Sequence, residues 1–183
     1  GLTRSEKAVT ALIQALKDQD YDVRRSAVEA LGNIGNRQAV TALLRASNYQ
    51  DYDVRHSAVK ALGNIGNQRA INALVQALNN MDSNVRRNAV EALGNIDNPQ
   101  AVDALVQALN DRDSSVRRNA VEALGKIGNP QVVGALVQAL NHRYFNVRRR
   151  AVEALENIGN QQVVDALVQA LNHQESYVRR SAV

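Results

Sequence analysis

Residues 22–36 read DVRRSAVEALGNIGN, and the same pattern returns as NVRRNAVEALGNIDN at 84–98 and as SVRRNAVEALGKIGN at 115–129. Its Val-Arg pair recurs every 31 residues without insertion or deletion, at Val23-Arg24, Val54-Arg55, Val85-Arg86, Val116-Arg117, Val147-Arg148 and Val178-Arg179. A fixed period of about 20 to 50 residues is typical of stacked-repeat proteins. The period therefore predicts repeats that pack on their neighbours, with function carried by an extended surface.

The first half of each repeat is predicted to be a helix. In the repeat 21–51, apolar residues fall at positions 23, 27, 28, 30, 31 and 34, which is a helical period and predicts a helix over about 21–33. Asp20 stands at the expected N-cap, and Gly35 stands where a left-handed residue would end the helix. In another repeat Asp97 replaces this glycine, and we expect it to adopt the same conformation.

The second half of each repeat is predicted to be another helix. Its apolar residues again recur at helical spacing and predict a helix over about 37–47, with Asn36 as N-cap. Two repeats place a proline directly after this asparagine, the first-turn position that proline favours: Pro99 and Pro130.

The register divides the chain into a single predicted array. It consists of a half repeat 1–20 with a helix over about 5–17, five full repeats and a partial repeat 176–183; the full repeats are 21–51, 52–82, 83–113, 114–144 and 145–175. The chain begins without Met and stops inside the pattern, so we expect a piece of a longer array. Exposed repeat ends would allow end-to-end stacking of copies.

Composition limits the functions available to the chain. The absence of cysteine excludes disulfides, thiolate metal sites and cysteine nucleophiles. No apolar run approaches the roughly 18 residues of a membrane span, and no signal-peptide pattern opens the chain, so we expect a cytoplasmic protein. The net charge of +4 permits an acidic partner without requiring one.

The alternation of VRRSAVEALGNIGN-type segments with segments such as QAVDALVQAL at 100–109 resembles the short HEAT-like repeat of the phycobilisome-lyase type. The pattern is also similar to artificial alpha-helical repeat proteins built on that consensus. The resemblance implies an all-α, right-handed α-solenoid of helix-turn-helix repeats. It implies protein binding in most settings, and bilin attachment or detachment in some members. The column begun by Asp20 departs from the consensus at Tyr144 and Glu175, and frequent Asn and Gln favour a natural origin.

Comparison between the repeats locates the candidate binding surface. Variation gathers in the turn before the first helix and on one stripe of that helix, which in the first repeat is Asp22, Arg25, Ser26, Glu29 and Asn33. The resemblance implies that this stripe lines the concave face. All six aromatic residues fall in this region, outside the apolar columns: Tyr21, Tyr49, Tyr52, Tyr144, Phe145 and Tyr177.

Tyrosine and arginine are enriched among the residues that dominate protein interfaces. We therefore predict a protein partner bound by Tyr21, Arg25, Tyr52, His56, Arg87, Arg118, Phe145, Arg149, Arg150 and Tyr177. Neutral variation in tolerant turns is the alternative interpretation. Nucleic acid is another, since the arginines could track phosphates at intervals of about 10 Å. Glu29, Glu91, Glu122 and Glu153 each follow an arginine by four residues and would offset its charge.

The invariant arginine of each pair is predicted to be structural rather than partner-binding. Arg24 and its equivalents Arg55, Arg86, Arg117, Arg148 and Arg179 each follow the column begun by Asp20 by four residues, within reach of that carboxylate. We therefore expect an inter-repeat and capping ladder.

Catalysis, a metal and a cofactor are not expected. His142 and His173 occupy equivalent turns and His56 lies elsewhere, whereas a metal site needs three or four converging ligands. No His-Glu dipeptide of the iron-binding HEAT-like hydroxylases, no Ser-His-Asp arrangement and no Gly-rich phosphate loop occurs. Bilin handling remains an alternative through the resemblance alone, although no residue stands out as its acid, base or clamp.

Overall fold

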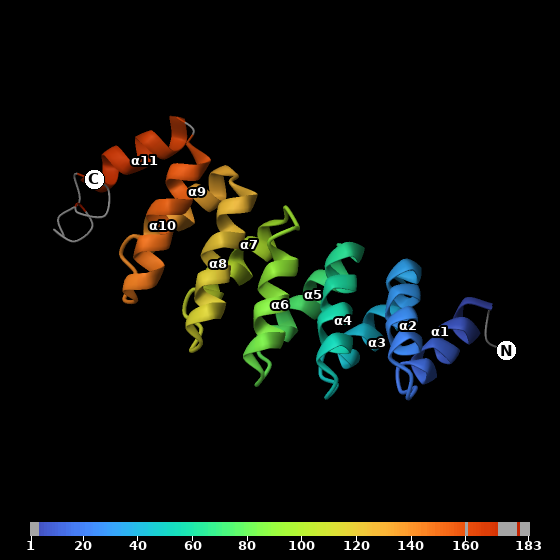
Figure 1. Cartoon of the computed structure of the whole chain (residues 1–183). Helices are drawn as coiled ribbons and strands as arrows, with labels where there is room; N and C mark the ends of the chain where they lie inside the picture. Colours follow the sequence, from blue (N-terminus) through green and yellow to red (C-terminus); the bar gives the residue numbers. More distant parts are fainter. Residues whose placement is uncertain (1–3, 160, 172–178, 180–183) are drawn as a thin grey trace. The chain divides into compact units, whose positions relative to one another are not determined.

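A computed structural model describes residues 4–159, 161–171 and 179, and these residues form helices joined by short turns (Figure 1). The helices are α1 Arg4–Ala15, α2 Tyr21–Ile34, α3 Arg37–Ala46, α4 Tyr52–Ile65, α5 Gln68–Ala77, α6 Ser83–Leu93, α7 Pro99–Ala108, α8 Ser114–Ile127, α9 Pro130–Ala139, α10 Phe145–Ile158 and α11 Gln161–Leu171. The predicted helices over 21–33, 37–47 and 5–17 are confirmed to within two residues at each end. The helix expected over 176–183 falls outside the described residues, apart from 179.

The chain forms two compact units, Gly1–Ala92 and Leu93–Val183. In the first unit α2 packs on α4, and α3 and α5, the second helices of their repeats, pack together behind them (Figure 1). In the second unit α8 packs on α10, with α9 contacting both. The same two-layer order of first and second helices therefore exists within each unit.

Local hydrogen bonds explain where the first helices start and stop. Asp20 accepts from the backbone N–H groups of Asp22 and Val23 at 2.7 and 3.3 Å, which satisfies two amides at the start of α2. Gly35 has φ 54°, and its N–H donates to the Leu31 carbonyl at 3.0 Å. The predicted caps at Asp20 and Gly35 are thus confirmed, as is Asn36, which accepts from the Ala39 N–H.

The prediction for Asp97 is wrong. No residue other than glycine has positive φ in the described part of the chain, and α6 ends at Leu93, whereas α2 and α4 continue to their isoleucines. A side chain disfavours the left-handed region, so the chain leaves the helix one turn earlier instead of ending at Asp97. The Asp97 carboxylate instead accepts from Asn129 Nδ2 at 2.8 Å.

Small residues set the spacing of the first helices. A Cβ built on Gly32 of α2 would lie 3.2 Å from Ala61 Cβ of α4, and one built on Gly125 of α8 would lie 3.1 Å from Ala154 Cβ of α10. At both positions the absence of a side chain therefore permits the close approach of the two helices. The leucines beneath, such as Leu31 and Leu124, are fully buried.

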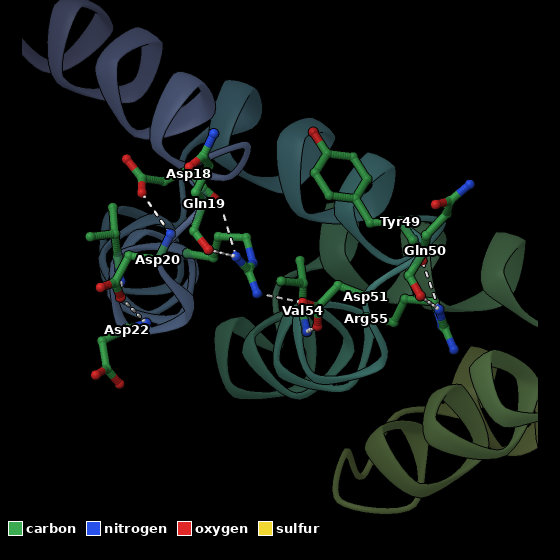
Figure 2. Close-up of polar contacts among 11 residues, drawn as sticks. Asp18, Gln19, Asp20, Asp22, Tyr49, Gln50, Asp51, Val54 and Arg55 are labelled. Atoms are coloured by element: carbon green, nitrogen blue, oxygen red, sulfur yellow. Dashed lines mark hydrogen bonds and ion pairs between the residues drawn. The ribbon is translucent and has the colours of Figure 1, made fainter.

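The ladder arginines bind differently from the prediction. Arg24 Nη1 donates to the Asp18 and Gln19 carbonyls at 2.9 and 2.8 Å, and its Nη2 pairs with Asp51 of the next repeat at 2.6 Å (Figure 2). Arg55 repeats this arrangement, with Asp82 at 3.3 Å. The inter-repeat role is confirmed, but the expected carboxylate four residues earlier is the wrong partner. Asp20 is engaged by its own helix amides, and the arginine extends to the following repeat.

Asp51 joins two functions in this ladder (Figure 2). Its Oδ1 accepts from the Val54 N–H at 3.0 Å as the cap of α4, while its Oδ2 pairs with Arg24. The Val54 hydrogen bond and the Arg24 guanidinium hold the pKa of Asp51 below its ordinary value. Capping and inter-repeat pairing therefore depend on the same ionised carboxylate.

The hydrogen bonds of His142, in the turn before α10, select one tautomer of its imidazole ring. Its Nδ1 accepts from the Tyr144 N–H at 3.3 Å, so its Nε2 carries the proton that it shares with Asn110 Oδ1 at 3.1 Å. Asn80 makes the same two contacts in the equivalent turn, accepting from the Asp82 N–H and donating to Asn48. The histidine therefore acts as a neutral amide-like linker between turns.

We expect His142 to make folding stability depend on pH. Burial, and then the charges of Arg143, Arg117 and Arg148, lower its pKa below the ordinary 6.5. His142 therefore takes up a proton more readily in the unfolded chain than in the folded protein. The free energy of unfolding is at its full value above about pH 6.5, and it is lost as the pH falls through the lowered pKa that His142 has in the folded protein. His142→Asn preserves both hydrogen bonds and should remove this loss. Thermal unfolding of both proteins between about pH 8 and pH 5 measures it; parallel profiles would contradict it.

Candidate partner-binding surface

Part of the predicted stripe of the first unit lines a groove between α2 and α4, whereas Asp22 and Ser26 lie outside its lining. The groove has a volume of about 670 Å³ and a floor that includes Gly32 and Ala61. Its walls are polar and come from both helices: Arg25, Glu29 and Asn33 on α2, and His56, Ser57, Lys60 and Asn64 on α4. The small floor residues and the long wall residues together create the depression.

Charges in this groove are mixed. Arg25 Nε pairs with Glu29 at 3.1 Å, and this hydrogen bond and charge raise the pKa of Arg25. Lys60 stands at the position equivalent to Glu29, so the α4 wall lacks that acid. His56 stacks on Tyr52 with ring centroids 6.1 Å apart, and its buried Nδ1 has no hydrogen-bond partner. The groove therefore offers both donors and acceptors.

An equivalent groove of about 400 Å³ lies between α8 and α10 in the second unit. Gly125 and Ala154 contribute to its floor, and its walls carry Glu122, Lys126, Arg150, Glu153 and Asn157. Arg150 pairs with Glu122 across the groove at 3.7 Å and with Glu153 at 3.0 Å. The recurrence of the groove at the same repeat positions makes it a property of the repeat.

A second hollow in this unit, of about 410 Å³, lies at the N-terminal ends of α8 and α10. We call it the arginine pocket, and it is lined by Ser114, Ser115, Arg117, Arg118, Asn146, Arg149 and Arg150. Three of the predicted site residues therefore meet here: Arg118, Arg149 and Arg150.

The predicted aromatic anchors lie at the helix starts and outside the lining of these hollows. Tyr21, Tyr52 and Phe145 are the first residues of α2, α4 and α10, with 41, 46 and 68% of their surfaces exposed. Each ring lies beside the ladder arginine three residues later, at 6.0, 5.7 and 5.6 Å from guanidinium carbon to ring centroid. Their exposure is what an interface anchor requires, although the rings of Tyr21 and Tyr52 make no mutual contact among the described residues.

The remaining predictions have mixed outcomes. The i, i+4 offset forms at Arg25 and at Arg149, which lies 3.6 Å from Glu153. Arg118 forms no such pair among the described residues, because Glu122 turns to Arg150. Arg87 is half-buried on α6, and Tyr177 lies outside the described residues. Sequence reasoning did not single out Ser115 and Asn146, although their replacement of Asp22 and Asp53 in one repeat column was a visible signal.

The described residues contain no group of three or more His, Asp or Glu side chains placed to hold a metal ion. Among the described helices, none combines the length and the apolar character that a membrane crossing needs.

Three solved structures are similar to this chain. The chain is similar to one chain in the structure of the complex of CpcE and CpcF of phycocyanin lyase from Nostoc sp., at 25% identity over 100% of this chain and 75% of that chain, with TM-score 0.57. It is also similar to a designed armadillo repeat protein in complex with the peptide (KR)4, at 25% identity over 95% of this chain and 96% of that chain, with TM-score 0.49. An engineered protein matches at 26% identity over 95% and 93%, with TM-score 0.47.

A search of curated protein sequences finds no match. The family model for HEAT repeats, in contrast, matches residues 9–82, 71–144 and 133–183. These matches extend over nearly the whole chain, and the all-helical repeats described above have the form that the family requires. The chain therefore belongs to the HEAT repeat family, whose members are α-solenoids that usually bind proteins.

Proposed function

We propose that the chain is a protein-interaction scaffold that holds its partner on the faces of the first helices. The observation that carries this proposal is the polar groove between neighbouring first helices, which recurs at equivalent positions in both units. A groove of this kind suits an extended segment of a partner, because its walls present side chains at fixed intervals. Packed helices lose little freedom on binding, so more of the contact energy appears as affinity.

The groove walls have the chemistry that a peptide needs. Asn33 and Asn64 in the first unit, and Asn157 in the second, carry amides that both donate and accept, as a peptide backbone does. The exposed rings of Tyr21, Tyr52 and Phe145 supply apolar area at the helix starts. Backbone-like hydrogen bonding in the grooves and aromatic contacts beside them together favour a protein partner.

Nucleic acid is a weaker candidate. A phosphate backbone needs a continuous basic track, whereas each groove carries glutamates beside its basic residues. In the first unit the exposed carboxylates of Asp22 and Asp53 also stand on the first helices. These acids would repel a polyanion.

Chromophore handling is a second candidate, favoured by the similarity to the phycocyanin lyase complex. A bilin bound in a helix groove would change its absorption spectrum. Titration of a bilin with the protein therefore separates the two candidates, since a scaffold that binds only proteins leaves the spectrum unchanged.

Affinity capture from source-cell lysate tests the scaffold proposal. The bait is compared with a variant carrying alanine at Tyr21, Tyr52, Phe145, Arg149 and Arg150. The matched control removes two arginines and three neutral residues from exposed positions of the second helices, with alanine at Arg37, Thr41, Arg69, Gln107 and Gln138. We expect a discrete protein that binds the parent and the control but not the five-site variant, with or without nuclease. Equal capture by both variants would refute the assigned face.

A further inference from the structure

We propose that the arginine pocket binds a phosphate monoester carried on a side chain of a protein partner. The inference rests on the proposed scaffold function and names the chemistry of one group that the partner presents. The pocket is lined by four arginines, two serines and an asparagine, without a carboxylate. Guanidinium groups bind phosphate oxygens through paired, planar hydrogen bonds, and hydroxyl and amide groups complete such a site.

Arg117 is the least exposed arginine of the pocket, and it differs from its ladder equivalents. It is 8% exposed, and its Nη1 donates to the Asp111 and Arg112 carbonyls at 2.7 and 3.1 Å. Arg24 and Arg55 direct Nη2 to a carboxylate of the next repeat, but Tyr144 replaces that carboxylate here.

The Tyr144 ring lies 3.9 Å from the Arg117 guanidinium carbon, so a cation–π contact stands where the ion pair would be. The Nη2 group of Arg117 is consequently left without a carboxylate. Its Nε also has no hydrogen-bond partner, as in Arg24 and Arg55, so the feature specific to this repeat lies at Nη2. A buried guanidinium without its counter-ion favours an anionic ligand.

Three further replacements make the pocket basic. Ser115 and Asn146 occupy the column that holds Asp22 and Asp53 in the first unit, so two acids are absent from its wall. Arg150 occupies the column that holds Ser26 and Ser57, so one cation is added. These substitutions meet in one hollow although they come from different helices. The acid is also absent at Asn84, but an arginine occurs at the position of Arg150 in none of the preceding repeats.

The charges that remain match a dianion. Glu153 pairs with Arg149 and Arg150, and Glu122 also pairs with Arg150, so the two glutamates offset two of the four arginine charges. Arg118 has no ion pair among the described residues, and Arg117 is balanced only by carbonyls and a ring. Two positive charges therefore remain, and a phosphate monoester carries about −1.5 to −2 at neutral pH. A single such group fits the local charge better than a polyanion, because the acids of the equivalent column reappear in the first unit.

Titration of the whole chain with inorganic phosphate tests the pocket directly. The arginine Nε–H resonances are followed by NMR, first with phosphate, then with a blocked Gly-phosphoserine-Gly peptide, its Gly-Glu-Gly equivalent and a single-stranded oligonucleotide. We expect Arg117 and Arg118 to shift with phosphate, and the phosphopeptide to bind at least about 10-fold more tightly than the glutamate peptide. Absence of shifts in the pocket arginines, or preference for the oligonucleotide over the phosphopeptide, would overturn the proposal.

Two variants give the assignment its specificity. Ser115→Asp with Asn146→Asp restores the acids of the first unit and should weaken phosphate binding at least about 10-fold. Gln107→Asp with Gln138→Asp adds the same negative charge at exposed sites on α7 and α9, and this control pair should change the affinity for phosphate little. Equal weakening by both pairs would overturn the site. The phosphate titration could fail while partner capture is still lost in the five-site alanine variant. That result would reject phosphate binding by the arginine pocket and leave the proposed scaffold function intact.

Discussion

Arg86→Glu is expected to lower the thermal unfolding temperature far more than Arg87→Glu, although the two arginines are neighbours in the same helix. Arg86 is 4% exposed, and its Nη1 donates to the Asn80 and Met81 carbonyls at 2.8 and 3.0 Å. Reversal would place a carboxylate against these carbonyl oxygens in a buried setting. Breaking a buried charged arrangement costs about 3–5 kcal/mol, which for a chain of this size corresponds to roughly 10 °C.

Arg87 provides the matched control, because its reversal changes the net charge by the same amount at a half-buried position of α6. Substitutions away from buried networks usually change stability by about 0.5 kcal/mol or less. Arg86→Lys separates charge from geometry, since lysine keeps the charge but lacks the planar fork that reaches two carbonyls. We expect its melting temperature to lie between those of the parent and Arg86→Glu. Equal losses at Arg86 and Arg87 would show that the ladder arginine has no special structural role.

The ladder also shows that one structural task can be performed by different chemistry. Arg24 is held by a carboxylate, whereas Arg117 is held by the Tyr144 ring in the equivalent place. Both arrangements leave Nη1 bound to the preceding turn, a contact that five ladder arginines share: Arg24, Arg55, Arg86, Arg117 and Arg148. The turn contact therefore preserves the repeat, and the Nη2 contact is free to change. That freedom allows the second unit to build a basic pocket without loss of the fold.

The helices and their caps could be predicted because their causes are local. Asp20 and Gly35 act on backbone groups within four residues, so their roles can be read from a single repeat. Asp97 shows the limit of this reasoning: aspartate can enter the left-handed region, but ending α6 earlier at Leu93 avoids that conformation altogether. Sequence spacing alone does not decide between two allowed helix ends.

The polar partners were harder to predict because they join different repeats. Arg24 is four residues from Asp20 and 27 from Asp51, and spacing along one helix favours the nearer carboxylate. The cap already occupies Asp20, so the longer contact forms. The arginine pocket has the same origin: Ser115 and Asn146 are unremarkable alone, and their effect arises only when two helices bring their missing acids to one hollow.

Gly63→Val should destabilise the chain by about 3 kcal/mol, since it forces apart two helices that touch through backbone and small side chains. A Cβ at Gly63 of α4 would lie 3.0 Å from Ala92 Cβ and 3.4 Å from Ala92 Cα of α6. The first of these contacts is tighter than nine in ten real Cβ contacts, and valine adds two methyl groups to it. Because the crowded atoms include the backbone of α6, rotation of a side chain cannot relieve them. Denaturant unfolding measures the loss.

Gly134→Val is the control that isolates packing from helix propensity. Gly134 lies within α9, and a Cβ there would meet no atom within 4 Å. Valine forms helices slightly better than glycine, so this variant should gain a few tenths of a kcal/mol. The same substitution is thus expected to change the free energy of unfolding in opposite directions at two helical glycines. The difference between the two changes measures the cost of separating α4 from α6. If Gly63→Val were stabilised instead, the contact between Gly63 and Ala92 would not determine the spacing of α4 and α6. The depth of the grooves at Gly32 and Gly125 would then need a cause other than the absent glycine side chain.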